Sequence, residues 1–172
     1  TRSGSQRNIA AHYDLGNDFY RSWLDPSMTY SAALFENAGD SLAQAQARKY
    51  RRIAGALGLA PDMRVLEIGC GWGGFAMLAA GEYGCRVTGL TLSREQLRYA
   101  TAAAAIAGLE NRVAFELCDY RDACGVYDRV VSIEMIEAVG AENWPVFWGA
   151  LRDRLRPGGS AMLQIITIDD AR

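Results

Sequence analysis

The sequence has few metal-ligating residues, little net charge and no long apolar run. One histidine and four cysteines without a Cys-x-x-Cys spacing argue against a zinc site, so we expect no metal. No apolar run approaches the roughly 20 residues of a membrane span, and no signal peptide opens the chain. A net charge of −2 argues against a general nucleic-acid binder. We therefore expect a cytoplasmic protein without a transmembrane segment or a nucleic-acid partner.

The most informative stretch is residues 65–74, which read Val-Leu-Glu-Ile-Gly-Cys-Gly-Trp-Gly-Gly. An apolar run with one carboxylate leads into a glycine-rich turn, and residues 75–80 then resemble a helix. Strand, glycine turn and helix in this order open the nucleotide-binding α/β domains. Glycines allow the backbone to approach a ligand, and the helix N-terminus directs its amides toward it. The stretch therefore predicts a nucleotide-like cofactor.

Two details favour S-adenosylmethionine (SAM) over a dinucleotide. Glu67 with Gly69, Gly71 and Gly73 forms E-x-G-x-G-x-G, which is typical of SAM methyltransferases. A NAD site would need an acid about 20 residues beyond the glycines to bind the ribose hydroxyls. The chain has Thr91 and Ser93 in that region instead. An NAD-dependent oxidoreductase is therefore the disfavoured alternative.

Strand and helix patterns alternate along the rest of the chain, which predicts a parallel sheet. Ser93 is expected to cap its helix, with Gln96 as capping-box partner. The ligand should lie at the carboxyl ends of the strands, beside the first one. We expect a Rossmann-like class I methyltransferase fold with helices on both faces, stopping after its fifth strand. The expected strands are 63–68, 85–90, 113–117, 128–133 and 161–168; the expected helices are 41–57, 75–83, 93–108 and one from Trp144 that ends at Pro157-Gly158-Gly159.

The N-terminal part of the chain differs in character from the rest. Residues 8–35 are rich in aromatic side chains interleaved with acids, and we expect them to cover a pocket. This divides the chain into a helical cover segment, 1–60, and a SAM-binding core, 61–172. The basic run 48–52 fits a solvated helix face better than a lipid-headgroup contact.

Several ordered blocks resemble the cyclopropane-fatty-acid synthase family, which includes the mycolic acid cyclopropane synthases and related lipid methyltransferases. The similarity spans residues 9–170, and we expect the chain to be a fragment of such an enzyme. The blocks are His12–Tyr20, Trp23–Asp25, Met28–Ser31, Val65–Gly74, Gly89–Ser93 and Tyr127–Gly140.

The resemblance implies SAM-dependent methyl transfer to the double bond of an unsaturated fatty acyl chain of a phospholipid. The alkene would attack the methyl group, and the resulting carbocation would lose a proton. Alternatives are a C-methyltransferase that gives a branched alkene, a small-molecule methyltransferase and a non-catalytic SAM-binding module. The lipid substrate places the protein at the inner face of the membrane as a peripheral protein, and a homodimer is possible.

Site residues follow from the resemblance, position by position. Glu137 would be the active-site carboxylate, and Tyr13 would stabilise the cation, as Phe19 could, although both rings may equally serve packing. Cofactor contacts would come from the turn and from the ends of neighbouring strands: Tyr30, Ser31, Glu67, Gly69, Gly71, Gly73, Thr91, Leu92, Gln96, Tyr120 and Ile133.

Two positions depart from the cyclopropane synthases, which bind bicarbonate as the base. Ala32 stands where those enzymes have a cysteine whose backbone helps to hold bicarbonate, and Gln164 stands where they have a histidine donor. Glutamine still donates hydrogen bonds but cannot become cationic. The sequence therefore leaves open both the bicarbonate site and the choice between a ring and a branched product.

Overall fold

The computed structural model describes residues 16–168, which form a five-stranded parallel sheet in the order β3-β2-β1-β4-β5. The strands are β1 (Arg64–Ile68), β2 (Arg86–Thr91), β3 (Val113–Leu117), β4 (Tyr127–Ile133) and β5 (Leu155–Gln164). The helices are α2 (Asn17–Arg21), α3 (Leu42–Ala56), α4 (Gly74–Tyr83), α5 (Arg94–Ile106) and α6 (Trp144–Arg154), with short 3-10 turns η1 (Ile136–Ala138) and η2 (Ala141–Asn143).

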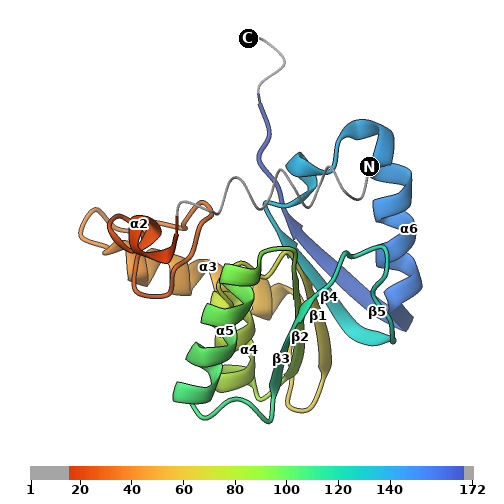
Figure 1. Cartoon of the computed structure of the whole chain (residues 1–172), viewed down its shortest axis with the longest axis horizontal. Helices are drawn as coiled ribbons and strands as arrows, with labels where there is room; N and C mark the ends of the chain where they lie inside the picture. Colours follow the sequence, from red (N-terminus) through yellow and green to blue (C-terminus); the bar gives the residue numbers. More distant parts are fainter. Residues whose placement is uncertain (1–15, 169–172) are drawn as a thin grey trace.

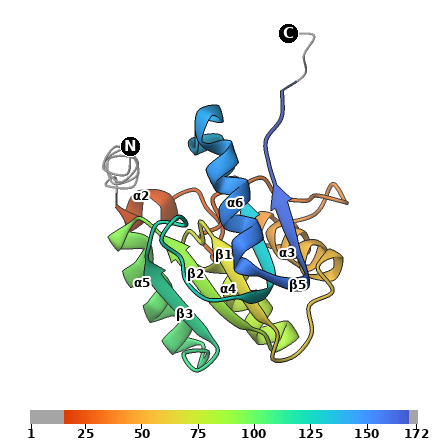
Figure 2. The same cartoon turned by 90° about the vertical axis from the view of Figure 1, so that its right-hand side faces the viewer.

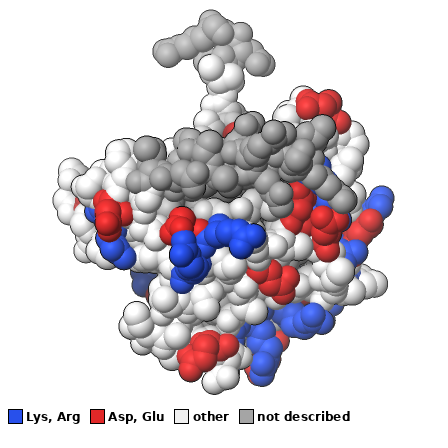
Figure 3. Space-filling view, viewed as in Figure 1, with Lys and Arg blue, Asp and Glu red and all other residues white. Residues whose placement is uncertain are grey.

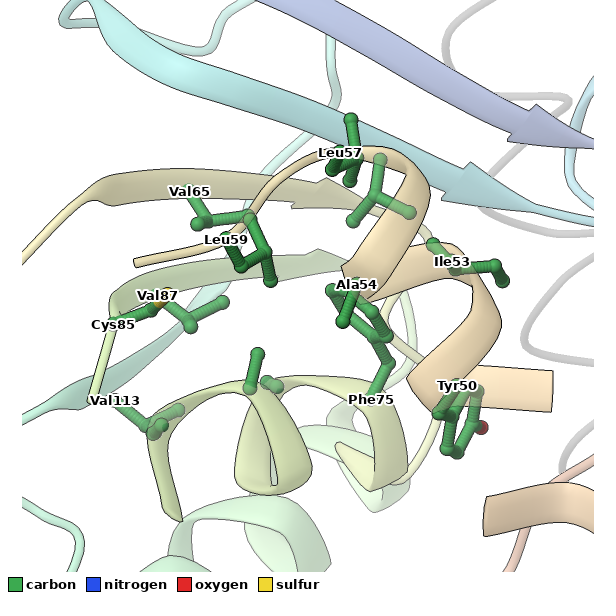
Figure 4. Close-up of a cluster of buried hydrophobic side chains, with 14 residues drawn as sticks. Tyr50, Ile53, Ala54, Leu57, Leu59, Val65, Phe75, Cys85, Val87 and Val113 are labelled. Atoms are coloured by element: carbon green, nitrogen blue, oxygen red, sulfur yellow. The ribbon is translucent and has the colours of Figure 1, made fainter. Parts of the chain in front are cut away.

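Helices cover both faces of this sheet, as the alternating pattern predicted (Figures 1 and 2). Alternate side chains of β1 point to opposite faces, since a strand has a period of two residues. Val65 packs with α3 and α4, whereas Leu66 and Ile68 pack with α6 on the other face. Figure 4 shows the first of these clusters, in which Phe75 of α4 lies beside Ala54 and Tyr50 of α3. The predicted α/β class is confirmed.

Helix α3 begins where the sequence indicates a start. Ser41 accepts a hydrogen bond from the Gln44 backbone, and the Gln44 side chain accepts one from the Ser41 backbone. This capping box satisfies two backbone donors that the helix itself leaves unpaired. Because Tyr50, Ile53 and Ala54 are buried against the sheet layer, α3 is part of the main core. The proposed division of the chain at residue 60 stays a prediction.

The C-terminal part of the sheet differs from expectation. Helix α6 ends at Arg154, and residues 157–159 lie inside β5 instead of ending the helix. Pairing with β4 jumps from Tyr127↔Leu155 to Arg129↔Ser160, so the Pro-Gly-Gly run forms an irregularity within the strand. β5 ends at Gln164, four residues before the expected Ile168. Proline is tolerated there because β5 lies at the edge of the described sheet.

Candidate functional site

An open cleft lies at the carboxyl ends of β1, β2 and β4, where strand order reverses on either side of β1. Ligands of open α/β sheets bind at such a switch point. The cleft encloses about 990 Å³, part of it open to solvent. Ten of the eleven predicted cofactor residues line it: Tyr30, Ser31, Glu67, Gly69, Gly71, Thr91, Leu92, Gln96, Tyr120 and Ile133.

The glycine turn between β1 and α4 combines two kinds of glycine. Gly71 lines the cleft with φ +54, and a Cβ there would meet no atom within 4 Å, so the space in front of it is open. Gly73 does not line the cleft. A Cβ at Gly73 would lie 2.6 Å from Phe115 Cζ, and its φ of +89 also favours glycine. Gly71 therefore leaves room for a ligand, whereas Gly73 allows close packing of the turn on β3.

Glu67 is the buried carboxylate of the cleft. Its neighbours in β1 point toward α6, so its side chain points toward α3 and α4. Burial raises the pKa of Glu67 to about 8, opposed in part by the Ala76 backbone and the charge of Lys49. Its Oε2 atom is buried without a hydrogen-bond partner among the described residues. An unpaired buried oxygen on a residue that lines the cleft suits a cationic ligand group such as the ammonium of SAM.

The far end of the cleft carries a polar pair at the start of α5. Thr91 Oγ1 donates to Gln96 Oε1 at 2.8 Å and accepts from the Ser93 backbone at 3.1 Å. Ser93 caps the helix by accepting from the Gln96 backbone, as predicted. The predicted reciprocal bond of the capping box is wrong, because Thr91 holds the Gln96 side chain instead. Thr91 and Gln96 thus form a preorganised polar surface on the side expected for the ribose.

Residues 28–31 form the wall of the cleft opposite the sheet, and α3 holds them in place. Lys49 donates to Ser31 Oγ at 2.5 Å, and Gln46 donates to the Ser31 carbonyl at 2.8 Å. Thr29 Oγ1 lies 2.9 Å from the buried Tyr50 hydroxyl. The segment before this wall is fixed by Trp72 of the glycine turn, whose Nε1 donates to Asn17 Oδ1 at 2.7 Å.

Glu134 also lines the cleft, although the sequence did not single it out as a site residue. It follows directly after β4, and its φ of +49 is unusual for a residue other than glycine. Its Oε1 accepts from the Ala32 backbone at 2.9 Å and from Gln164 Nε2 at 2.7 Å. The signal that could have found it is an acid at the end of a strand beside the switch point.

The two predicted catalytic residues lie elsewhere or outside the described part of the chain. Glu137, in η1, is exposed and is absent from the lining of the cleft; its Oε1 accepts from the Ile166 backbone at 2.5 Å. Tyr13 lies outside the described residues. Phe19, the other candidate for stabilising the cation, is 48 % exposed and packs edge-on against Tyr20 and Trp23. The predicted catalytic roles stay predictions.

The basic run of α3 is largely paired with protein groups. Arg48 pairs with Asp40 at 2.5 Å, and Arg51 pairs with Glu82 at 2.7 Å. Lys49 is buried, whereas Arg52 is exposed. On the face seen in Figure 3, positive and negative side chains are interspersed. Within residues 16–168, no helix combines the length and apolarity needed to cross a membrane.

Cysteines and acids do not gather into a metal centre. Cys70 and Cys85 are buried free thiols, and among residues 16–168 no three His, Cys, Asp or Glu side chains are placed to hold a metal ion. Burial raises the pKa of the Cys70 thiol, which lines the cleft next to Glu67. A raised pKa keeps this thiol protonated and poorly nucleophilic.

The sequence of this chain is similar to those of known proteins over most or all of its length. Residues 1–172 match the family profile described as mycolic acid cyclopropane synthetase. The chain is 46 % identical to tuberculostearic acid methyltransferase UfaA1 of Mycobacterium tuberculosis over 179 residues, which cover 100 % of the chain and 42 % of that protein. It is 43 % identical to cyclopropane-fatty-acyl-phospholipid synthase of Escherichia coli strain K12, covering 90 % of the chain and 39 % of the relative.

Solved structures agree with the sequence comparison. The crystal structure of mycolic acid cyclopropane synthase CmaA1 complexed with SAH and CTAB matches with a TM-score of 0.87 and 36 % identity, over 92 % of this chain and 55 % of that one. The chain thus spans about half the length of the proteins it matches or less. The prediction of a Rossmann-like class I methyltransferase fold is confirmed. The chain belongs to the mycolic acid cyclopropane synthetase family.

Proposed function

We propose that this chain binds SAM in the cleft and is the SAM-binding part of an enzyme that methylates the double bond of an unsaturated fatty acyl chain. The observation that carries the proposal is Glu67, which lines the cleft beside the glycine turn and whose buried Oε2 has no hydrogen-bond partner within residues 16–168. A cation placed there would restore the missing interaction and favour the ionised carboxyl. SAM combines such an ammonium group with an adenosine part.

Different residues of the cleft would contact different parts of the cofactor. Glu67 would hold the ammonium group, and the open space at Gly71 would accept the methionine chain. Thr91 and Gln96 would bind the ribose hydroxyls, with Tyr120 beside the adenine. When bound, SAM supplies the electrophilic methyl group. Ile133 and Met135 would give that end of the cleft an apolar wall, which limits access of water to a cationic intermediate.

A lipid acceptor is supported by the family and by exposed aromatic rings that pack together next to Tyr30 of the cleft. The matched relatives carry fatty acyl or mycolic acid names, and these similarities run through the cleft residues. Around the segment 19–30, Phe19, Trp23 and Tyr30 are each about half exposed. An acyl chain could cover these rings while the reacting carbons approach Ile133. We propose an unsaturated acyl chain of a phospholipid as substrate, met at the membrane surface.

The product is either a cyclopropane ring or a methyl-branched alkene. The cyclopropane-fatty-acyl-phospholipid synthase name belongs to a relative at 43 % identity, and the tuberculostearic acid methyltransferase name to one at 46 % identity. Identity therefore does not separate the two reactions. The specific observation that favours the branched product is Gln164, which replaces the family's histidine and donates to Glu134.

The test uses the complete natural protein that contains this sequence, expressed in a host that lacks cyclopropane lipids and supplied with methyl-labelled methionine. Extracted phospholipids are examined by proton NMR, because a ring and a methylated alkene have the same mass gain. Upfield cyclopropane protons establish the ring, and labelled methyl on an alkene establishes the branched product. The Gly71→Val variant should give no label, whereas Gly39→Val, at an open surface glycine, should label normally.

Absence of label in the lipids would contradict the proposal. If that protein still binds SAM, the location of the label separates two alternatives. Label in a soluble product indicates a small-molecule methyltransferase, and no label in any product indicates a binding module. Failure to bind SAM would contradict the cofactor assignment itself.

A further inference from the structure

Glu134 joins three segments at the catalytic end of the sheet. It lies between the end of β4 and η1, and its backbone N–H donates to the Gln164 carbonyl at 2.8 Å, which extends the pairing of β4 with β5. Its side chain crosses to the loop at Ala32, 102 residues earlier in the chain. Glu134 also follows Ile133 directly in the chain, and the resemblance places the transferring methyl group near Ile133.

The contacts of Glu134 involve the two positions that set this chain apart from the bicarbonate-binding enzymes. Its Oε1 accepts from the Ala32 backbone N–H and from the Gln164 side-chain amide. The same Gln164 amide also approaches the Ala32 carbonyl at 3.3 Å. In the family pattern, position 32 supplies a backbone contact to bicarbonate and position 164 a side-chain donor. Here both donors point at a carboxylate that belongs to the protein.

The backbone conformation of Glu134 supports a functional role for its carboxylate. A φ of +49 is disfavoured for a residue with a Cβ, and glycine would adopt it at lower cost. Strained residues of this kind concentrate at functional sites. Only Oε1 of the carboxylate accepts hydrogen bonds within residues 16–168, so Oε2 has no protein donor there. The carboxylate is thus held at one oxygen and can use the other toward the cleft.

We propose that Glu134 is the base that removes the proton after methyl transfer, in the place of bicarbonate. This inference rests on the proposed function. Once the alkene has formed a new bond to the methyl carbon, the acyl chain carries a carbocation. Glu134 then takes a proton from one of two carbons. If the proton comes from the transferred methyl group, the electron pair of that C–H bond closes the ring onto the cationic carbon; if it comes from a chain carbon next to the cationic centre, the pair forms a new double bond. In either case the proton leaves Glu134 to solvent before the next turnover.

Neighbouring groups account for the fixed orientation of Glu134. Lys49, the nearby cation on α3, interacts with the charge of Glu134 as well as those of Asp25 and Glu67. Gln164 is a neutral donor, so it holds the carboxylate without donating a proton of its own during the reaction. Glu137 differs from Glu134 because it is exposed and accepts a backbone bond from Ile166. Glu134 is therefore the carboxylate of the pair that lines the cleft.

The test measures turnover of the complete natural protein with labelled SAM and vesicles of dioleoylphosphatidylglycerol, in buffer purged of carbon dioxide and with bicarbonate added back. We expect the wild-type rate to be the same in both buffers. Glu134→Gln keeps the shape of the side chain and should bind SAM normally, while its turnover falls roughly 10²–10⁴-fold. Glu134→Gly opens an anion site between Ala32 and Gln164, so added bicarbonate should restore part of its activity. Glu110→Gln, at an exposed acid, is the matched control.

The outcomes distinguish failure of the role of Glu134 as base from failure of the proposed function. A wild-type enzyme that labels the lipid only when bicarbonate is present would overturn the role of Glu134 and leave the proposed function intact. Full activity of Glu134→Gln with normal SAM binding would do the same. No labelled lipid from the wild-type protein in either buffer would overturn the proposed function together with this inference.

Discussion

The Lys49 ammonium lies 2.5 Å from the Ser31 hydroxyl and so ties α3 to the wall of the cleft. Burial lowers the pKa of Lys49 to about 8, although three carboxylates nearby oppose the shift. The lysine does not line the cleft itself. It acts on the ligand by holding Ser31, which does.

Replacement of Lys49 by methionine should therefore weaken SAM binding without removing any cleft-lining group. Without this bond Ser31 has to be ordered when the ligand binds, which costs roughly 0.5–1.5 kcal/mol, so the dissociation constant should rise roughly 2- to 12-fold. Isothermal titration calorimetry would measure it. Arg52→Met removes an exposed cation of the same helix and should leave the affinity unchanged. Equal affinities of the two variants would show that Ser31 needs no support from Lys49.

The ionisation of Glu67 predicts that SAM affinity rises with pH. Because burial raises the pKa of Glu67 to about 8, the ligand-free carboxyl is mostly protonated at pH 7. Binding of an ammonium group favours the carboxylate, so the complex releases a proton and becomes tighter as pH rises from 7 toward about 8. Calorimetry in two buffers of different ionisation enthalpy would detect this proton.

The variant Glu67→Gln should lose both the proton release and most of the affinity. Glu116→Gln, at an exposed acid on β3, should keep both.

The same pKa shift has a consequence for the stability of the ligand-free fold. Folding favours the protonated form of Glu67. Its contribution therefore lowers the free energy of unfolding as pH rises from about 4.5, the ordinary pKa of the group, to about 8. Glu67→Gln should flatten that part of the curve of stability against pH.

Gly71 and Gly73 should respond differently to added side chains. A Cβ at Gly73 would lie 2.6 Å from Phe115 Cζ, so Gly73→Ala should lower the free energy of unfolding by roughly 1–3 kcal/mol. Gly71→Val enters open space and should abolish SAM binding by filling the cleft, at a smaller cost in stability from its positive φ. Denaturant unfolding and SAM titration of both variants would test the distinction. A Gly73→Ala protein of wild-type stability would refute the packing role.

Glu137 remains the carboxylate that the family pattern assigns to the reaction. Its bond to the Ile166 backbone fixes the chain immediately after β5. We expect Glu137→Gln to retain SAM binding and to lose roughly 10²–10³-fold in turnover, because the family pattern lets this carboxylate stabilise charge near the cation. Glu142→Gln, at an exposed acid nearby, serves as control. Unchanged turnover in Glu137→Gln would restrict this residue to a structural role.

The fold was predictable because its signals are local. The run from Val65 to Gly74 contains the strand, the turn and the start of the helix, and Ser41 with Gln44 contains a complete capping box. The end of α6 was missed because Pro157 and the glycines after it resemble a helix stop. An edge strand tolerates them, and only the pairing with β4 reveals the irregularity.

The lining of the cleft was predictable for the same reason, since Glu67 and Thr91 lie at the carboxyl ends of β1 and β2. Their roles toward a cofactor stay predictions. Glu134 was not predictable, because its meaning depends on partners far away in the sequence. Nothing near position 134 indicates that its side chain meets Ala32 and Gln164. Thr91 likewise takes the Gln96 side chain away from the expected capping box.

Trp72 belongs to the glycine turn and also anchors the segment that begins at Asn17. It packs on Tyr20 and Met28 and is only 2 % exposed, whereas Trp23, Trp144 and Trp148 are each near half exposed. If residues 17–28 move away from the glycine turn, water reaches this one indole. A red shift and quenching of its fluorescence would then report the movement in real time, so the chain carries its own optical probe of this contact.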